Sequence, residues 1–288
     1  MILVCGATGE LGGRITRMLL AQGRSVRVLV RPGSNYLPLV EAHAEPAFGD
    51  LKNRLSLEAA CRDIKTVLTT ANSARRGNDD NPQMVDLEGN RNLIGAARAA
   101  GVKHFIFISA LIADANSPLP FLAAKGKTEE SLQSSGMDYT ILAPDYFMDS
   151  WIGRVVGQPA LNGQPVPIVG SGERLHSFMA VRDVVQFAIA AIDHPAARNQ
   201  KLLLGGPQGF CYLDAVKTYE AVLGRPVPVL RIQPGEPVPG VRPGLWGILA
   251  SLDLGDWVVP MEETSRTYGV RLTSLEEFVR GMATPANR

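Results

Sequence analysis

Residues 2–13 read Ile-Leu-Val-Cys-Gly-Ala-Thr-Gly-Glu-Leu-Gly-Gly, an apolar run that leads into a glycine-rich segment. From Ile15 to Leu20 the apolar residues recur at helical spacing, so the stretch predicts a strand, a tight turn and a helix. A second strand is expected at residues 25–30, which read Ser-Val-Arg-Val-Leu-Val. Two strands that bracket one helix are typical of a βαβ unit.

The glycine-rich turn has the chemistry of a dinucleotide site. A turn without Cβ atoms lets backbone N–H groups and the following helix N-terminus approach a pyrophosphate, and the helix dipole favours the anion. The turn follows a strand and opens a helix, which is the context that the motif requires. The alternative is that the glycines only make a tight turn. The predicted cofactor residues in this segment are Gly6, Thr8, Gly9, Glu10, Leu11 and Gly12.

The alternation of strands and helices continues to Pro144. Strands are expected at residues 45–48, 66–70, 104–108 and 139–142, and helices at 55–61, 82–100 and 119–135. This order predicts a doubly wound α/β fold, with a parallel sheet that helices cover on both faces. Beyond Pro144 we expect helices at 146–156, 213–223 and 274–280, a loop at 157–172, a helix capped by Asp183, and short strands at 178–181 and 201–204. Residues 231–270 have no assignable pattern.

Composition narrows the class of protein. The 288 residues carry 29 Lys and Arg against 28 Asp and Glu, a net charge of +1 that argues against a nucleic-acid-binding protein. The sequence has no apolar run long enough to span a bilayer and no secretory signal pattern, so we expect a cytoplasmic protein. Three separated cysteines and four scattered histidines predict core thiols and no metal site.

Proline and tryptophan are distributed unevenly. Only four of the 20 prolines precede residue 117, and the three tryptophans all follow residue 150. The first part of the chain is therefore expected to be regular structure, and the second a loop-rich region that shapes a pocket.

The end of the second strand bears on the choice of cofactor. An NAD site usually has Asp or Glu there to accept from the ribose 2′-OH, whereas this chain has Arg31, whose guanidinium suits a 2′-phosphate. Ser34 adds a hydroxyl and Arg14 is a further candidate. The sequence thus favours NADP(H) over NAD(H). The alternative is that Arg31 is a solvated loop charge.

Several segments together resemble a known family. They are residues 6–13, Val30-Arg31, Gly49-Asp50-Leu51, the stretch from Asp86-Leu87-Glu88-Gly89-Asn90 to His104, residues 134–142 (Ser-Ser-Gly-Met-Asp-Tyr-Thr-Ile-Leu) and residues 178–184 (Phe-Met-Ala-Val-Arg-Asp-Val). The chain resembles the NmrA-like and isoflavone-reductase-like branch of the atypical short-chain dehydrogenase/reductases. The resemblance is dense over residues 1–150 and thin after about 205.

The resemblance implies a Rossmann domain for NADP(H) over residues 1–150, its sheet completed by segments within 176–205. It implies that residues 151–288 mainly form a smaller C-terminal α/β region that binds the substrate. By the same resemblance, Asp50 and Leu51 contact the adenine side of the cofactor, and Ala71 and Asn72 contact the nucleotide. Both pairs follow predicted parallel strands, where α/β sheets bind ligands. Asp50 has the alternative role of a helix N-cap.

The catalytic tyrosine of classical relatives is missing. Their Tyr-x-x-x-Lys motif corresponds here to Phe121-Leu122-Ala123-Ala124-Lys125, and a phenyl ring carries no proton. In the isoflavone-reductase-like branch the lysine itself serves as general acid/base or as a ribose ligand, which implies that role for Lys125. A lysine needs desolvation to transfer protons at neutral pH. The alternative is an exposed helix lysine paired with Glu129.

Three further residues complete the predicted site. Ser109 matches the position of a serine near the reacting centre of related reductases, although a strand-end turn would explain it equally. Tyr146 adds a hydroxyl near the expected nicotinamide pocket. Phe147 is predicted to contact the cofactor. Together with Met148 and Trp151 it forms an apolar stretch that either lines a pocket for a flat apolar substrate or packs in the core.

Two hypotheses for the function remain open. The first is an NADPH-dependent reductase of a small apolar acceptor such as a quinone or an enone. The second is a non-catalytic NADP(H) redox sensor that reports to a protein partner. Lys125 favours the enzyme, and the missing tyrosine favours the sensor. The charged loop with Arg75, Arg76, Asp79 and Asp80 is expected to be solvated.

Overall fold

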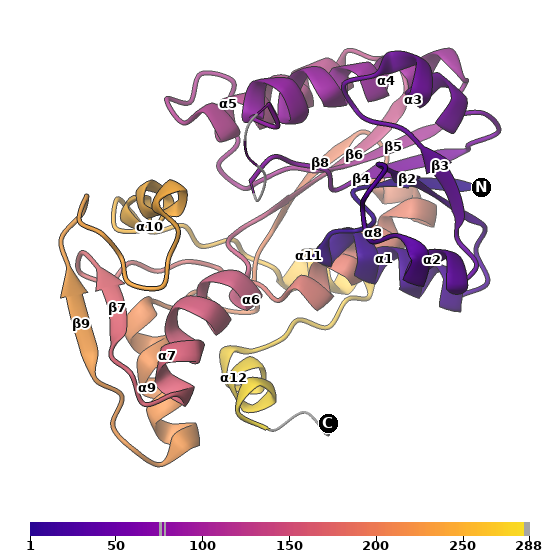
Figure 1. The fold of residues 1–288 in the computed structure, drawn as a ribbon. Coiled ribbons are helices and arrows are strands. Elements are labelled where there is room, and N and C mark those ends of the chain that lie inside the picture. The colour runs from indigo at the N-terminus through magenta and orange to yellow at the C-terminus, as the bar shows by residue number, and fades with distance from the viewer. Residues whose placement is uncertain (75–76, 78, 285–288) are drawn as a thin grey trace. The chain divides into compact units, whose positions relative to one another are not determined.

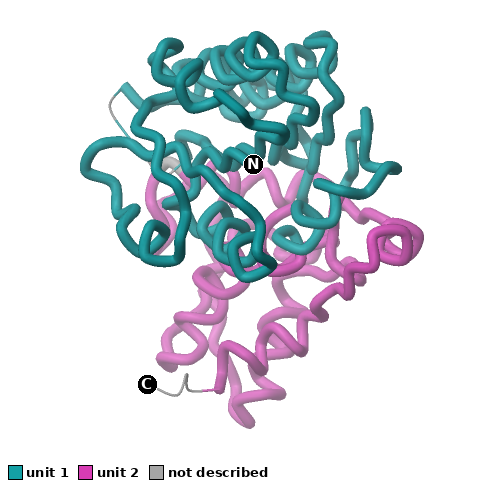
Figure 2. The backbone as a smooth tube through the Cα atoms, turned by 90° about the vertical axis from the view of Figure 1, so that its right-hand side faces the viewer, with its two compact units in different colours: residues 1–144, 184–203 teal, residues 145–183, 204–288 magenta. Residues whose placement is uncertain are grey.

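The structure of the protein is a computed structural model that describes residues 1–74, 77 and 79–284. The chain forms two compact units (Figure 2). Unit 1 comprises Met1–Pro144 and Val184–Leu203, and unit 2 comprises Asp145–Asp183 and the chain from Leu204 onward. The predicted loop residues Arg75 and Arg76 lie outside the described residues.

Unit 1 is built on a seven-stranded sheet with the order β3-β2-β1-β4-β5-β6-β8. Its strands are β1 (Ile2–Cys5), β2 (Val26–Val30), β3 (Glu45–Phe48), β4 (Thr66–Thr69), β5 (His104–Ile108), β6 (Asp138–Pro144) and β8 (Gln200–Leu204). The register of every neighbouring pair from β3 to β6 is parallel. The strand order reverses between β1 and β4, so a ligand site is expected at the carboxyl ends of these strands.

Helices cover both faces of the sheet (Figure 1). One face carries α1 (Glu10–Ala21), α2 (Leu37–Glu41) and α8 (Val181–Asp193), and the other carries α3 (Arg54–Ala60), α4 (Asn90–Ala99) and α5 (Pro120–Gln133). Strands buried on both sides are mostly apolar, and β1 and β5 are buried at every position. The polar residue of β5, His104, is hydrogen-bonded to the Thr140 hydroxyl at 2.8 Å. Cys5, Cys61 and Cys211 are buried and free, as predicted. The doubly wound parallel-sheet fold class is confirmed.

The predicted helix over 82–100 is divided. Pro82–Gly89 is wound as a π-helix, η1, and the α-helical part begins only at Asn90. Gly89 stands at this change of winding, and a Cβ there would lie 2.8 Å from Cβ of Leu51. The absent side chain lets this helix pack closely against the segment after β3.

Unit 2 combines short helices with a two-stranded parallel sheet of β7 (Val166–Val169) and β9 (Val229–Ile232). Its helical segments are α6 (Met148–Trp151), η2 (Gly153–Gly157), α7 (Gln158–Leu161), α9 (Tyr212–Leu223), η4 (Pro243–Leu245), α10 (Trp246–Ser251), α11 (Glu262–Tyr268) and α12 (Leu275–Ala283). The core between them includes Phe178, Tyr219 and Val279. A short 3₁₀ turn, η3 (Pro195–Ala197), precedes β8.

Three local predictions are wrong in this region. Residues 178–181 form only an isolated bridge, in which Met179 pairs with Phe147, and the residues predicted as a loop include β7. Asp183 does not cap α8, which begins two residues earlier. The backbone N–H of Val181 donates to the carboxylate of Asp149 (2.8 Å), and Asp183 instead accepts from the backbone and hydroxyl of Thr273 (both 2.8 Å). Both carboxylates use long-range partners that local sequence does not indicate.

Unit 2 also buries an unusual carboxyl group at its first residue, Asp145. The residue is 7% exposed, and its Oδ2 atom has no hydrogen-bond partner among the described residues. Burial raises the pKa of Asp145 to about 7, because removing water disfavours the charged form, while the backbone N–H groups of Tyr146 and Ser177 oppose the shift. The carboxyl group is therefore largely protonated in mildly acidic solution.

A methyl group at Gly12 should disrupt the first turn of α1. Its Cβ would lie 2.3 Å from the carbonyl oxygen of Gly6, which is backbone and cannot move aside. We expect Gly12→Ala to lower the free energy of unfolding by about 1–3 kcal/mol and to abolish dinucleotide binding. Denaturant titration and calorimetry measure the two effects. Gly95→Ala, in α4 with open space around its Cβ, is the control and should stabilise by ~0.5–1 kcal/mol. Equal behaviour of the two variants would contradict the prediction.

Asp145 should make stability depend on pH. The folded protein holds the proton up to a pKa of about 7, whereas the unfolded chain releases it near about 3.9. The native state therefore binds more protons between these values, and its stability falls as the pH rises through this window. Asp145→Asn removes the ionisation. Between pH 4 and pH 8, the free energy of unfolding of the variant should therefore rise relative to that of the parent by on the order of 2–4 kcal/mol.

Denaturant unfolding at several pH values measures this difference. Asp63→Asn, at an exposed position, serves as the control and should follow the parent. Parallel pH curves for the parent and Asp145→Asn would show that Asp145 ionises normally in the folded protein.

Candidate functional site

The glycine turn lies where the carboxyl ends of β1 and β4 meet. Gly6 has a φ of +82°, and a Cβ there would lie 2.6 Å from Oγ1 of Thr70 and 2.8 Å from the backbone nitrogen of Ala71. The backbone N–H of Gly9 donates to the Gly6 carbonyl at 3.0 Å. These contacts explain why the turn needs glycine: the β1–α1 connection packs directly against the end of the neighbouring strand.

The same turn fits a pyrophosphate. Helix α1 begins after Gly9, and no side chain of the described residues caps its first N–H groups. A helix start with uncapped donors at the switch point of the sheet attracts an anion. Thr8 is exposed and Leu11 is half-buried, while Glu10 forms an i,i+4 pair with Arg14 (3.3 Å). The predicted residues of the turn thus form one continuous segment around uncapped donors.

Four charged groups meet beyond the ends of β2 and β3. The Arg31 guanidinium lies 2.6 Å from Asp80 and 3.8 Å from Asp50, and the Lys52 ammonium lies 2.6 Å from the other oxygen of Asp80. Asp80 has a side chain only 12% exposed, so the expectation that it is simply solvated is wrong. Lys52 and Asp80 are functional candidates that the sequence analysis missed.

The remaining nucleotide-side residues take local roles. The Ser34 hydroxyl donates to the Arg31 carbonyl (2.7 Å), and the Asp50 carboxylate accepts from the backbone of Lys52 (2.9 Å). The cap of α3 is Asn53 and not Asp50, because Asn53 accepts from the backbone of Ser56. Leu51 and Ala71 are buried, and Asn72 bonds the backbone of Thr70 and Ala74. All of them lie just past strand ends, and a contact with the cofactor stays a prediction.

Lys125 is buried inside unit 1. It is 4% exposed, and its ammonium donates to the carbonyl of Ile108 at 2.8 Å. The nitrogen also lies 4.9 Å from the ring centre of Phe107 and 5.2 Å from that of Phe121. The alternative of an exposed lysine paired with Glu129 is therefore wrong. Burial lowers the pKa of Lys125, and the nearby carboxylates of Asp86 and Glu129 partly offset this.

Ser109 belongs to a buried polar chain. Its hydroxyl donates to Oε1 of Glu129, and the ammonium of Lys201 bonds Oε2 of the same carboxylate at 2.6 Å. Because Glu129 is only 6% exposed, this chain ties the end of β5 to α5 and β8. The Ser109 hydroxyl thus already donates its hydrogen bond to Glu129. A direct role of Ser109 at a substrate stays a prediction. Glu129 and Lys201 lie far apart in the sequence, so no local pattern predicted their pairing.

Tyr146 and Phe147 belong to unit 2, whereas Ser109 and Lys125 belong to unit 1. The Tyr146 hydroxyl lies 3.4 Å from that of Ser251, and its ring packs edge-on against Trp151 and His176. Burial raises the pKa of Tyr146, so the phenol stays protonated at neutral pH. Phe147 is half-buried at the start of α6, next to the fully buried Met148.

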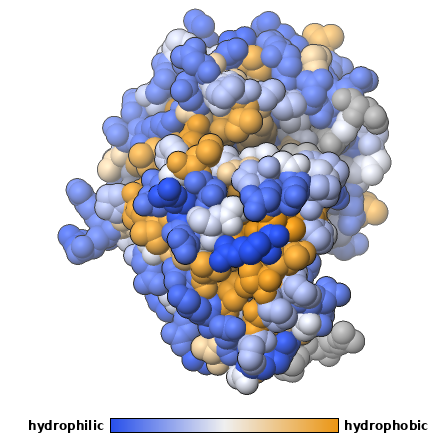
Figure 3. All heavy atoms as spheres, turned by 90° about the vertical axis from the view of Figure 1, so that its left-hand side faces the viewer, coloured by the Kyte–Doolittle hydropathy of each residue, from blue (hydrophilic) through white to orange (hydrophobic). Residues whose placement is uncertain are grey.

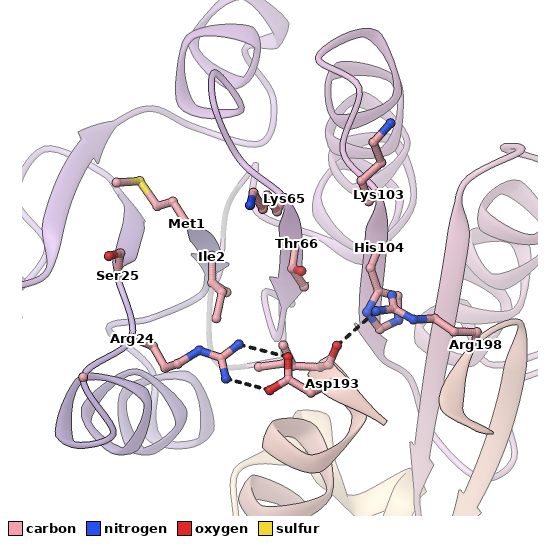
Figure 4. A pocket seen from close by; sticks show the side chains of 12 residues that line it. Met1, Ile2, Arg24, Ser25, Lys65, Thr66, Lys103, His104, Asp193 and Arg198 are labelled. Atoms are coloured by element: carbon pink, nitrogen blue, oxygen red, sulfur yellow. Dashed lines mark hydrogen bonds and ion pairs between the residues drawn. The ribbon is translucent and has the colours of Figure 1, made fainter. Parts of the chain in front are cut away.

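A separate cavity opens at the opposite, amino-terminal edge of the sheet in unit 1 (Figure 4). It has a volume of about 450 Å³. Arg24 pairs there with Asp193 at 2.6 Å, while Arg198 bonds the carbonyl of Ile192. Burial lowers the pKa of His104 in its wall to about 4, so the imidazole is neutral. None of the predicted site residues lines this cavity, so it is distinct from the nucleotide edge.

Comparison with known proteins supports the cofactor class. Residues 6–195 match the family described as NAD(P)H-binding. The photosystem II assembly factor Ycf39 of Cyanophora paradoxa is 33% identical over 231 residues, 80% of this chain and 71% of its own. The NAD(P)H azoreductase of Xenophilus azovorans is 29% identical over 79% of this chain and 75% of its own.

Among solved structures, the NADPH-dependent quinone oxidoreductase QOR2 of Escherichia coli, complexed with NADPH, superposes with a TM-score of 0.81. It covers 99% of this chain and all of its own at 22% identity, which shows a shared fold. Among the described residues, no helix is both long enough and apolar enough to cross a membrane. The family match and the glycine turn agree: the chain belongs to the NAD(P)H-binding family and has a Rossmann fold.

Proposed function

We propose that the protein is an NADPH-dependent reductase that transfers hydride to a small, largely apolar acceptor such as a quinone or an enone. Lys125 carries this proposal: a cation buried against Ile108 and two aromatic rings, at the carboxyl end of β5. Burial removes the hydration of the ammonium, and one hydrogen bond to a carbonyl compensates only part of this cost. A role in folding alone therefore does not explain why Lys125 is buried. The azoreductase and quinone oxidoreductase similarities support the same class.

The residues at the nucleotide edge are suited to hold the cofactor. We assign the pyrophosphate to the uncapped start of α1 and the 2′-phosphate to Arg31. When bound, NADPH supplies the hydride. NADP(H) is preferred over NAD(H) because a guanidinium, and no acidic group, ends β2.

Lys125 is the proposed proton donor. Its lowered pKa brings the ammonium nearer to the range in which a lysine gives up a proton at neutral pH. The Phe121 ring cannot donate, but it excludes water from the same nitrogen. Lys125 therefore takes over the role that the missing tyrosine has in classical relatives. Ser109, held by Glu129, is proposed to keep the end of β5 in place.

The composition of unit 2 supports an apolar acceptor. Tyr146 and Trp151 are partly buried on its aromatic core, next to Phe178. Unit 2 also exposes large apolar side chains, among them Val229 and Leu230 of β9. Figure 3 views the side on which β7, β9 and α10 lie and shows apolar surface gathered there among polar groups. We propose that Tyr146 and Phe147 belong to the acceptor and nicotinamide side of the site.

A second function, a non-catalytic NADP(H) sensor with a protein partner, is favoured by two observations. Phe121 replaces the catalytic tyrosine, and the Ser109 hydroxyl is committed to Glu129. The similarity to Ycf39, a photosystem II assembly factor by name, fits such a role. A sensor would bind NADPH but would not transfer its hydride to any acceptor of a test panel.

Turnover should depend on Lys125. We expect the parent to consume NADPH with at least one member of a panel of quinones, enones and azo dyes, followed by absorbance. Lys125→Met keeps the buried volume and removes the proton, so turnover should fall by about 10²-fold or more while NADPH binding changes only a few-fold. Lys127→Met, at an exposed position of the same helix, is the control. Unchanged turnover in Lys125→Met would refute its catalytic role, and an inactive parent would favour the sensor.

Cofactor preference should depend on Arg31. Calorimetry is expected to show NADPH binding more tightly than NADH by about tenfold, which corresponds to roughly 1.4 kcal/mol. The difference should close in Arg31→Asp and narrow in Arg31→Ala, because both remove the guanidinium. Equal affinities for the two cofactors in the parent and in Arg31→Ala would remove the assignment of the 2′-phosphate to Arg31.

A further inference from the structure

The carboxylate of Asp80 bridges two cations at the nucleotide edge. One oxygen lies 2.6 Å from the Arg31 guanidinium, and the other lies 2.6 Å from the Lys52 ammonium. The three residues come from the end of β2, the segment after β3 and the loop after β4. The Asp80 carboxylate is thus held between an arginine and a lysine. Arginine and lysine are also the side chains that proteins use to bind phosphate groups.

We propose that Asp80 stands in for the 2′-phosphate of NADP(H), and that the cofactor must displace this carboxylate to reach Arg31 and Lys52. The inference rests on the proposed assignment of the 2′-phosphate to Arg31 and adds two residues to it. Lys52 is the second cation of the phosphate site, and Asp80 is an internal competitor that sets how strongly the site distinguishes NADPH from NADH.

The charge balance supports competition. Among the described residues, Arg31 and Lys52 bring two positive charges to this cluster, and Asp50 and Asp80 bring two negative charges. A phosphate monoester brings close to two further negative charges at pH 7. With Asp80 in place it would meet two carboxylates, whereas with Asp80 displaced it would meet an excess of positive charge. NADH carries no 2′-phosphate and does not need the exchange.

Burial supports the same assignment. The Asp80 side chain is 12% exposed, whereas those of Arg31 and Lys52 are 39% and 30% exposed. The carboxylate is therefore largely covered while both cations keep access to solvent, so a ligand can approach the cations from outside. The hydrogen bond with Asp80 also raises the pKa of Lys52 and keeps it charged.

Calorimetric titration of the full chain with NADPH, NADP⁺ and NADH tests the proposal without relying on turnover. We expect Asp80→Ala to bind NADPH about tenfold more tightly than the parent, and to bind NADH within about twofold of it. Asp80→Asn, which keeps the shape and removes the charge, should change NADPH affinity in the same direction. Because the charges are partly exposed, the increase in NADPH affinity should become smaller as the salt concentration is raised from about 50 to about 500 mM.

Two matched controls separate a local exchange from a general charge effect. Asp79→Ala removes the same charge from an exposed neighbour in the same loop, and it should leave NADPH affinity near that of the parent. Lys52→Met should weaken NADPH binding by about fivefold with NADH unaffected. Lys65→Met, at the amino-terminal edge of the sheet, should affect neither.

The outcomes distinguish this inference from the proposed function. If Asp80→Ala and Asp80→Asn bind NADPH no better than Asp79→Ala, Asp80 does not compete and the inference fails. A weaker affinity in both variants would also overturn it, because Asp80 would then support the site. Failure of the proposed function appears differently, as a parent that binds no dinucleotide or that transfers hydride to no acceptor of the panel. Unchanged NADPH affinity in Arg31→Ala would remove the assignment of the 2′-phosphate to Arg31.

Discussion

The close approach of α1 to the Gly6 carbonyl is the contact on which the nucleotide edge depends. Gly12 has no room for a Cβ against that carbonyl or against Thr70 at the end of β4. The absence of side chains therefore brings three pieces of backbone together: the end of β1, the start of α1 and the end of β4. Only with this packing do the first N–H groups of the helix point into the switch point of the sheet. The cofactor class follows from a steric requirement before any charged residue is considered.

Charge is then added to this frame in two ways. Near the surface, Arg31 and Lys52 are neutralised by carboxylates of the same chain and remain within reach of solvent. In the interior, Lys125 is held by a carbonyl, two aromatic rings and the fields of Asp86 and Glu129. A buried charge adds little stability even when paired. The burial of Lys125 is therefore the basis of its proposed catalytic role, and the surface cluster is the basis of the proposed phosphate site.

The sheet was predictable because its physical signal is local. Strands covered on both faces are mostly apolar, and β1, β2, β4 and β5 stand out as short runs dominated by apolar and β-branched residues between glycines and polar turns. Unit 2 was predicted poorly for the opposite reason. Its strand β7 reads Val-Pro-Ile-Val between glycine-rich segments, and α10 and α11 lie in a region rich in proline and glycine. β7 and α10 form through packing in the core around Tyr219, to which they contribute Val166, Ile168 and Leu249.

The sequence by itself determined the βαβ turn, the parallel sheet, the cofactor class and the two positive residues Arg31 and Lys125, because each follows from residue type and spacing within one short segment. Tertiary structure alone decided the partners of those charges. Asp80 reaches Arg31 across 49 positions of the chain, and Lys201 reaches Glu129 across 72. It also decided that Lys125 is buried, since an i,i+4 pair with Glu129 on an exposed helix face would have the same sequence. Spacing identifies groups that share an element, whereas burial and pairing depend on what the other elements bring to them.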